Sequence, residues 1–278
     1  MAGAPWRVVF LTVVPAVAQG YDQIVRALGH EPVAVITPRR RRRGAPVGPL
    51  APSLLADGPE IDVAFVERRS SIAPLLRAYE ADLALCTGFP WRIPAEAIAV
   101  PRHGIVNGHP SLLPRYRGPY PVAWAVRNGE QEIGLTYHLM DASFDTGPVL
   151  AQTSVPLGGE TWGTLQDTLA AAAPALLAQA FERLARGDTG DPQEGPGEYQ
   201  SEFEEAYRFV DLAQPAADVH RQARAWSFMP PILPEMGPLL ERNGTRVRLV
   251  RTSLVEVADA ERVECADGPL WIVESEPA

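Results

Sequence analysis

The stretch Gly104-Ile-Val-Asn-Gly-His-Pro-Ser-Leu-Leu-Pro-Arg-Tyr-Arg-Gly118 organises the rest of the chain. It begins with a short apolar run and continues with an amide, an imidazole, a hydroxyl and two guanidinium groups. Two prolines, Pro110 and Pro114, exclude a regular helix over most of it. The pattern predicts a strand over residues 104–106, followed by a fixed loop that begins at Asn107 and presents polar groups.

Residues upstream of this stretch alternate between strand and helix patterns. Buried strands are expected over residues 7–14, 31–36, 61–66 and 82–87, with helices over 19–28 and 70–79. This order predicts an α/β fold with a parallel sheet. Because ligands bind beyond the carboxyl ends of such strands, the turn at Gly88 and the Asn107 loop are expected to face one pocket.

Residues downstream predict a second, smaller domain. A helix is expected over 119–127, strands over 133–140 and 149–155, and a long helix over 161–186. Residues 187–200 are rich in glycine and proline, as linkers are. We expect a catalytic domain over 1–190, a linker over 191–207 and a small β-rich domain over 208–278. The last contains a helix over 215–226 and short strands over 247–250, 253–257, 263–265 and 270–273, like an abbreviated OB-type barrel.

Composition narrows the chemistry. The chain has 278 residues and a net charge of −9, and all 25 basic residues are arginine, which excludes lysine Schiff bases and P-loop lysines. Its two cysteines are not in a metal-type spacing, which favours a reduced, cytoplasmic setting. No apolar run reaches the roughly 18–20 residues that cross a membrane. Adjacent arginines form either a solvated surface loop or a phosphate-contacting one; these are Arg39, Arg40, Arg41, Arg42 and Arg43.

Three polar residues suit an addition–elimination at a carbonyl. Asn107 and His109 are two residues apart, so in an extended segment their side chains point the same way. Asp145 lies in another polar turn that could reach them. An amide can donate to a developing oxyanion, an imidazole can donate or move protons, and a carboxylate can orient the imidazole. The same spacing also suits a purely structural pair, and His103 and His138 suit core roles or, with His109, a zinc site.

The motifs from Asn107 to Gly118, together with Asp145-Thr-Gly147 and the run His138-Leu-Met-Asp141, resemble the folate-dependent formyltransferase family. Methionyl-tRNA formyltransferases are the closest group in layout. The resemblance implies a Rossmann-like domain that binds 10-formyltetrahydrofolate. No metal is predicted, because the sequence contains no tight ligand motif. It also implies that Asn107, His109 and Asp145 are catalytic. The residues implied at the donor pocket are Thr87, Gly88, Phe89, Trp91, Ser111, Leu113, Leu139 and Asp141.

Within this resemblance the amine acceptor stays open. Methionyl-tRNA, contacted through the arginine run, and a small amine such as an amino-sugar nucleotide or a hydroxyornithine-type precursor are rivals. Hydrolysis of the formyl donor would use the same three residues. One position departs from the family, because Gly108 stands where relatives usually carry a bulky aliphatic residue. That departure could loosen the spacing between Asn107 and His109.

Overall fold

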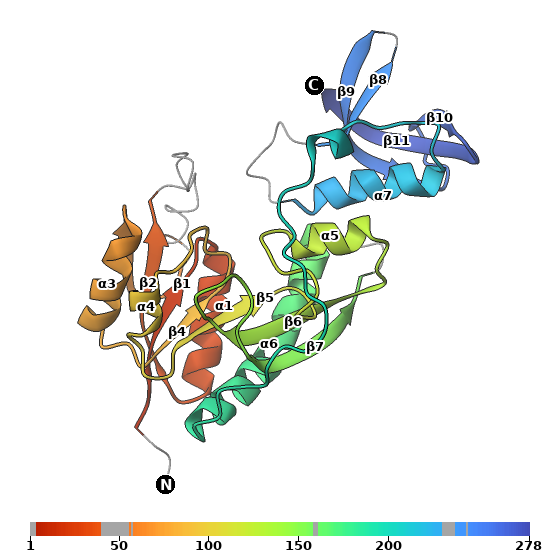
Figure 1. The fold of residues 1–278 in the computed structure, drawn as a ribbon. Helices are drawn as coiled ribbons and strands as arrows, with labels where there is room; N and C mark the ends of the chain where they lie inside the picture. The colour runs from red at the N-terminus through yellow and green to blue at the C-terminus, as the bar shows by residue number, and fades with distance from the viewer. Residues whose placement is uncertain (1–3, 40–55, 57, 158–160, 230–236, 243) are drawn as a thin grey trace. The chain divides into compact units, whose positions relative to one another are not determined.

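The computed structural model describes residues 4–39, 56, 58–157, 161–229, 237–242 and 244–278 (Figure 1). The predicted arginine loop therefore falls mostly outside the described residues, which include only Arg39. Among the helices that are described, none is long and apolar enough to cross a membrane.

A seven-stranded sheet carries the fold, in the order β3-β2-β1-β4-β5-β6-β7. The pairs from β3 to β5 are parallel, whereas β5 and β6 are antiparallel. Chain order reverses between β1 and β4, which is where open α/β sheets bind ligands. The strands are β1 Arg7–Leu11, β2 Glu31–Pro38, β3 Asp62–Val66, β4 Leu83–Cys86, β5 Ile105–His109, β6 Glu132–Leu139 and β7 Val149–Pro156.

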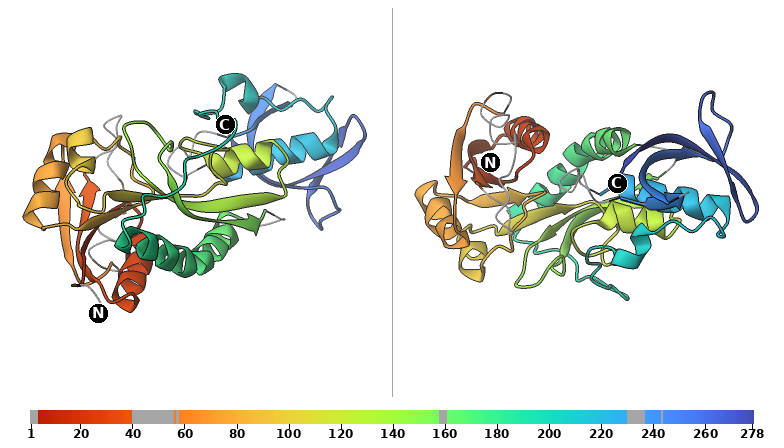
Figure 2. Two further views of the ribbon diagram at one scale, coloured as in Figure 1. Left: turned by 60° about the horizontal axis from the view of Figure 1, so that its bottom comes forward. Right: turned by 90° about the horizontal axis from the view of Figure 1, so that it is seen from above.

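Successive side chains of β1 pack alternately into two hydrophobic cores, one on each face of the sheet. Val8 and Phe10 pack with the buried residues of α1 (Pro15–Ala27) and α6 (Trp162–Ala185). Val9 and Leu11 pack with α3 (Ile72–Ala78) and α4 (Ala95–Ile98). Figure 2 shows these two pairs of helices on opposite sides of the strands. A strand buried on both faces explains the continuous apolar run in its sequence.

Two predictions around this sheet are wrong in their bounds. The loop expected from Asn107 begins later, because β5 continues to His109 and residues 107–109 pair with β6. The first helix begins at Pro15 rather than at residue 19, since proline is tolerated in a first helical turn. The segment expected as a linker forms β-bridge pairs, at Asp191 with Val149 and at Tyr199 with Arg117.

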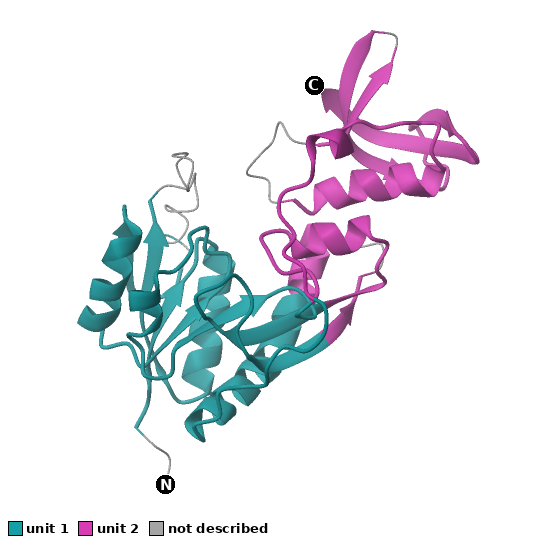
Figure 3. Cartoon of the chain, viewed as in Figure 1, with its two compact units in different colours: residues 1–114, 134–153, 169–196 teal, residues 115–133, 154–168, 197–278 magenta. Residues whose placement is uncertain are grey.

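The chain divides into two compact units (Figure 3). The first comprises residues 1–114, 134–153 and 169–196, and the second comprises 115–133, 154–168 and 197–278. The domain bounds at 190 and 208 stay a prediction. Within the second unit, the sheet is antiparallel in the order β10-β11-β9-β8, and α7 (Ala216–Ser227) packs on its core. The predicted fold class, a Rossmann-like domain with a small β-rich one, is confirmed.

The strands of the small sheet differ from those expected. They are β8 Leu239–Arg242, β9 Thr245–Ser253, β10 Glu261–Cys265 and β11 Gly268–Pro277. The strand predicted over 253–257 is wrong, because the Ser253 hydroxyl bonds both the backbone nitrogen and the carbonyl oxygen of Val255 and closes a turn. Strand β8 was not predicted, since its sequence is short and mixes leucine with charged residues.

Candidate active site

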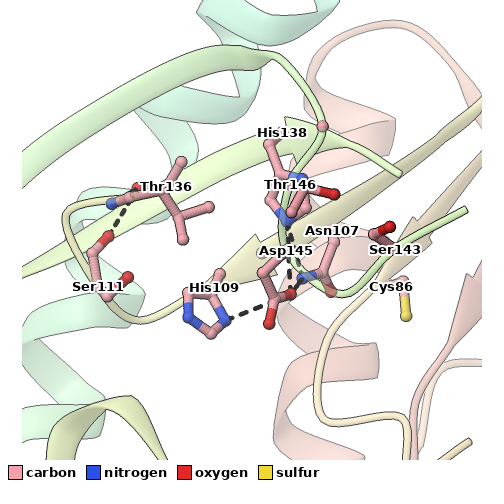
Figure 4. A network of polar contacts seen from close by, with 12 residues as sticks. Cys86, Asn107, His109, Ser111, Thr136, His138, Ser143, Asp145 and Thr146 are labelled. Atoms are coloured by element: carbon pink, nitrogen blue, oxygen red, sulfur yellow. Dashed lines mark hydrogen bonds and ion pairs between the residues drawn. The ribbon is translucent and has the colours of Figure 1, made fainter. Parts of the chain in front are cut away.

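Asn107, His109 and Asp145 converge at the end of β5 (Figure 4). The Asp145 Oδ1 atom lies 3.3 Å from Asn107 Nδ2, which donates to it, and 3.7 Å from His109 Nδ1. The His109 side chain is 6% exposed and that of Asp145 13% exposed, so little water screens the pair. The expectation that Asn107 and His109 point the same way is confirmed, because both reach the same carboxylate.

His138 on β6 joins this group, although the sequence suggested it only for a core role or, with His103 and His109, for a zinc site. Its Nδ1 lies 2.9 Å from the carbonyl oxygen of Leu139, and its Nε2 lies 3.1 Å from Asn107 Nδ2. A carbonyl oxygen only accepts, so Nδ1 carries the hydrogen and Nε2 of the neutral ring accepts from the amide. Because Nδ2 is thus the donor to His138, the nitrogen end of the Asn107 amide also faces Asp145. The pairing of Asn107 with His138 across β5 and β6 was the signal that could have found it.

Asp145 is held by backbone features of its own turn. Its φ of 56° is left-handed, a conformation that aspartate tolerates better than most residues. Gly147 lies so close to β6 that a Cβ there would be 1.8 Å from the Leu139 carbonyl oxygen. The Gln193 side-chain amide donates to the carbonyl oxygens of Asp145 and Gly147, at 2.9 and 2.8 Å. A residue from the expected linker therefore anchors the turn.

The segment after His109 is fixed against β6 and β7. The Thr136 hydroxyl donates to the Ser111 carbonyl oxygen at 2.6 Å, and the Gln152 amide donates to the Leu113 carbonyl oxygen at 3.1 Å. Gly134 permits this approach, since a Cβ there would lie 2.6 Å from the Leu112 nitrogen. Ser111 is fully buried and Leu113 is nearly so. Both predicted donor-pocket residues thus have fixed backbone positions beside His109.

The predicted donor turn from Thr87 to Trp91 follows β4. Gly88 has a left-handed φ of 65°, and the rings of Phe89 and Trp91 meet edge to face at 6.0 Å. Both rings are partly buried against the core beside α3 and α4. The Thr87 hydroxyl points into the protein and donates to the carbonyl oxygens of Cys86 and Gly108. Only the main chain of Thr87 is therefore placed to meet a ligand.

The other predicted donor loop, from Leu139 to Asp145, is tied to that turn by Arg92. The Arg92 guanidinium donates to the Ala142 carbonyl oxygen and lies 5.8 Å from the centre of the Phe144 ring. Leu139 ends β6 and packs on the core. The Asp141 carboxylate accepts from the Ser143 nitrogen and the Thr146 hydroxyl, so it shapes the loop.

A pocket of 520 Å³ opens next to these two segments. None of Asn107, His109 and Asp145 lines it. Two guanidinium groups, Arg69 and Arg92, and one carboxylate, Glu96, line it. The lining residues are Arg69, Ser70, Arg92, Ile93, Pro94, Ala95, Glu96 and Ala142.

Two other chemistries are disfavoured by the geometry. Burial, with the negative charge of Asp145 nearby, raises the pKa of the Cys86 thiol to about 12, so it is not a thiolate nucleophile at neutral pH. His103 stacks on Trp6 at 3.9 Å, whereas His109 and His138 face Asp145. Over the part of the chain that the structure describes, no group of three or more His, Cys, Asp or Glu residues could hold a metal ion.

Comparison with known proteins identifies the family. A family model described as formyl transferase matches residues 19–181. The methionyl-tRNA formyltransferase of Rhizorhabdus wittichii is 30% identical over 279 residues, covering 95% of this chain and 88% of the relative.

Two solved structures share the fold. A 4-N formyltransferase from Francisella tularensis has a TM-score of 0.69 at 17% identity, over 92% of this chain and 100% of that one. HypX from Aquifex aeolicus in complex with tetrahydrofolic acid has a TM-score of 0.71 at 20% identity. That match covers 99% of this chain and 44% of HypX, so this chain spans less than half of that protein. The family match and the close relative together show that the chain is an enzyme of the formyl transferase family.

Proposed function

We propose that the enzyme transfers the formyl group of 10-formyltetrahydrofolate to a primary amine, with Asn107, His109 and Asp145 as the catalytic residues. The observation that carries this proposal is their convergence, in which one carboxylate lies 3.3 Å from an amide donor and 3.7 Å from an imidazole nitrogen. Such a group supplies hydrogen-bond donors to an oxyanion and a partner for the imidazolium.

The reaction follows from the roles of these groups. The unprotonated amine attacks the formyl carbon, and the carbonyl electron pair moves onto the oxygen, where Asn107 and His109 donate to it. Asp145 keeps His109 charged and oriented and takes the proton that the attacking nitrogen loses. The bond from carbon to N10 of the folate then breaks, and N10 receives a proton from His109. Transfer of the proton from Asp145 to His109 restores the starting state.

Asn107 can take part because its two Nδ2 hydrogens differ. One bonds His138 at 3.1 Å, and the other bonds Asp145 at the longer distance of 3.3 Å. The longer and weaker bond is the one that the formyl oxygen would replace. His138 keeps the amide in the correct orientation during that exchange.

The donor pocket of this proposal combines the turn from Thr87 to Trp91 with the loop from Leu139 to Asp145. The pterin ring would lie against main-chain groups of both segments, beside Ser111 and Leu113. The adjoining pocket supports a folate in particular, because its Arg69 and Arg92 guanidinium groups match the carboxylates of a glutamyl tail.

Two kinds of amine acceptor are considered, each supported by a different observation. The name of the Rhizorhabdus wittichii relative suggests methionyl-tRNA. The charge of the C-terminal region favours a small amine instead, because residues 197–278 carry 15 acidic and 8 basic side chains. Ion pairs with glutamates also engage each arginine on the strands of the small sheet: Arg242, Arg246, Arg248, Arg251 and Arg262. Neutralised arginines contribute little to binding phosphates.

The test is incubation with 10-formyltetrahydrofolate alone, then with methionyl-tRNA, then with small amines that include amino-sugar nucleotides and hydroxyornithine. The proposal predicts slow consumption of the donor alone and rapid formylation of one amine. Formate released from the donor alone as fast as with every amine would show a hydrolase and refute transfer.

A further inference from the structure

A cluster of buried hydroxyl groups lies on the face of β5 away from Asp145. Tyr21 of α1 and Tyr137 of β6 are 4% and 3% exposed. The Tyr21 hydroxyl lies 2.5 Å from Thr87 Oγ1 and also bonds the Tyr137 hydroxyl. Thr87 Oγ1 lies 2.6 Å from the carbonyl oxygen of Cys86 and 3.1 Å from that of Gly108. The cluster thus joins α1 and β6 to the ends of β4 and β5.

The hydrogen bonds of this cluster all point in one direction, from Tyr137 toward the backbone carbonyls. A carbonyl oxygen only accepts, so the single Thr87 hydroxyl hydrogen points to Cys86 and Gly108. Tyr21 must then donate to Thr87, and Tyr137 donates to Tyr21. Burial raises the pKa of both tyrosines, so both hydroxyls keep the hydrogen that they donate. Each hydroxyl is therefore fixed by the next one along the series.

Gly108 leaves the space that this cluster occupies. A Cβ at that position would lie 2.5 Å from Thr87 Oγ1 and 2.9 Å from both the Tyr21 hydroxyl and Tyr137 Cε1. Tyr137 is also the cross-strand partner of Gly108, so its ring covers the glycine on the neighbouring strand. Any side chain at position 108 would have to displace a hydroxyl that holds β4 and β5 together.

We propose that Tyr21, Thr87 and Tyr137, packed against Gly108, form a positioning network that sets where Asn107 and His109 stand relative to Asp145. The Gly108 carbonyl oxygen, which Thr87 holds, lies in the chain between the two proposed catalytic residues. Movement of that carbonyl rotates the backbone on both sides of it and displaces both side chains. None of the three network side chains touches the reacting atoms, so they act through β5. This inference rests on the proposed function for its kinetic consequences only.

The test compares variants that differ by one hydroxyl. Thr87→Val keeps the shape of the side chain without the hydroxyl, and Thr87→Ser keeps the hydroxyl. We expect Thr87→Val and Tyr21→Phe to lower kcat by about tenfold with little change in the KM for the donor, because misplaced catalytic groups slow the chemical step. Thr87→Ser should restore most of kcat. Tyr79→Phe, at the end of α3, is the matched control and should leave kcat unchanged.

A second readout needs no turnover. The imidazole ¹H–¹⁵N resonances of His109 report its place beside Asp145 in the free enzyme. They should shift in Gly108→Ala, Thr87→Val and Tyr21→Phe, and stay at their wild-type positions in Thr87→Ser and Tyr79→Phe. Wild-type resonances in the first three variants would overturn the network. If the wild-type enzyme formylated no amine, the proposed function would be refuted. The His109 resonances would still test the positioning network.

Discussion

The end of β5 and the small C-terminal sheet use charge in opposite ways. At β5, the Asp145 carboxylate, which is 13% exposed, contacts one amide and the imidazoles of His109 and His138, which are 6% and 1% exposed. On the small sheet each arginine meets a glutamate near solvent, as in Arg251 and Glu274 with exposed fractions of 67% and 55%. Exposed pairs contribute little energy, whereas buried groups interact strongly. The difference teaches that the number of charged residues in a region says less about its chemistry than their burial and shared partners do.

The largest effects on formyl transfer are expected from substitutions at the end of β5. We expect Asn107→Ala and His109→Ala each to lower kcat/KM for formyl transfer by at least ~10²-fold, because each removes a donor to the oxyanion. The double variant should be only slightly slower than either single one, since the residues act together. Steady-state kinetics with the identified amine measures this. His220→Gln, which alters a histidine of the second unit, should keep wild-type kinetics, and near-normal rates in both alanine variants would end the assignment.

Two glycine variants separate the effect of site geometry on turnover from an effect on folding stability. Gly147→Ala should lower kcat/KM by about tenfold or more, because the new Cβ would overlap the Leu139 carbonyl oxygen and displace the Asp145 turn. Gly20→Ala lies within α1 and meets no atom within 4 Å. It should raise the free energy of unfolding by about 0.5–1 kcal/mol and leave turnover unchanged. Urea unfolding and kinetics on the same preparations test both, and full activity in Gly147→Ala would show that the turn is not constrained as described.

A smaller effect is expected at the amino end of the same sheet. His30 and His103 stack on Trp6, and burial lowers the pKa of both below the usual value near 6.5. Below that pH the unfolded chain binds more protons than the folded one, so the free energy of unfolding should decrease as the pH falls from about 6.5. Thermal unfolding from pH 8 to 5 measures the slope. His103→Gln should flatten it, and an unchanged slope would contradict this origin.

The smallest effect is expected on the C-terminal sheet. Arg248→Gln breaks the pair with Glu276 and should change the free energy of unfolding by less than about 1 kcal/mol, with no change in formyl transfer. The comparison between the two regions would fail if this variant slowed transfer as much as a change at β5. A KM for the acceptor that rose steeply with salt in the wild type, and less in Arg248→Gln, would instead indicate phosphate binding on this sheet.

The sequence predicted what depends on local spacing. The two-residue interval between Asn107 and His109 places both side chains on one face because a strand has a period of two, and β5 confirms it. The position of Gly88 after a buried run likewise marked a turn at the end of a strand, although the strand ends one residue earlier than expected, at Cys86. The parallel pairing of the first strands followed from the alternation of strand and helix patterns, and the small β-rich domain followed from its short strand candidates and the family resemblance, whereas the order of the strands in the sheet was not predicted.

The residues that the sequence did not reveal form hydrogen bonds with partners that are distant in the sequence. Gln193 reaches Asp145 across 48 positions, and Tyr21 reaches Thr87 across 66. Neither glutamine nor tyrosine carries a local signal of such a partner. Gly108 is a departure that was expected to loosen the site, yet its strand pairs regularly with β6, and its missing side chain leaves room for two hydroxyls and an aromatic ring.

Asp145→Asn, compared with Asp259→Asn, tests the central claim most directly. Both aspartates have a left-handed backbone, with φ of 56° and 63°, and asparagine tolerates that conformation equally well. The two variants therefore differ in location and not in local strain. We predict that Asp145→Asn lowers kcat/KM for formyl transfer by at least ~10²-fold, because the neutral amide cannot hold a charged His109 or accept a proton, while Asp259→Asn keeps wild-type kinetics. Equal rates in the two variants would contradict the account.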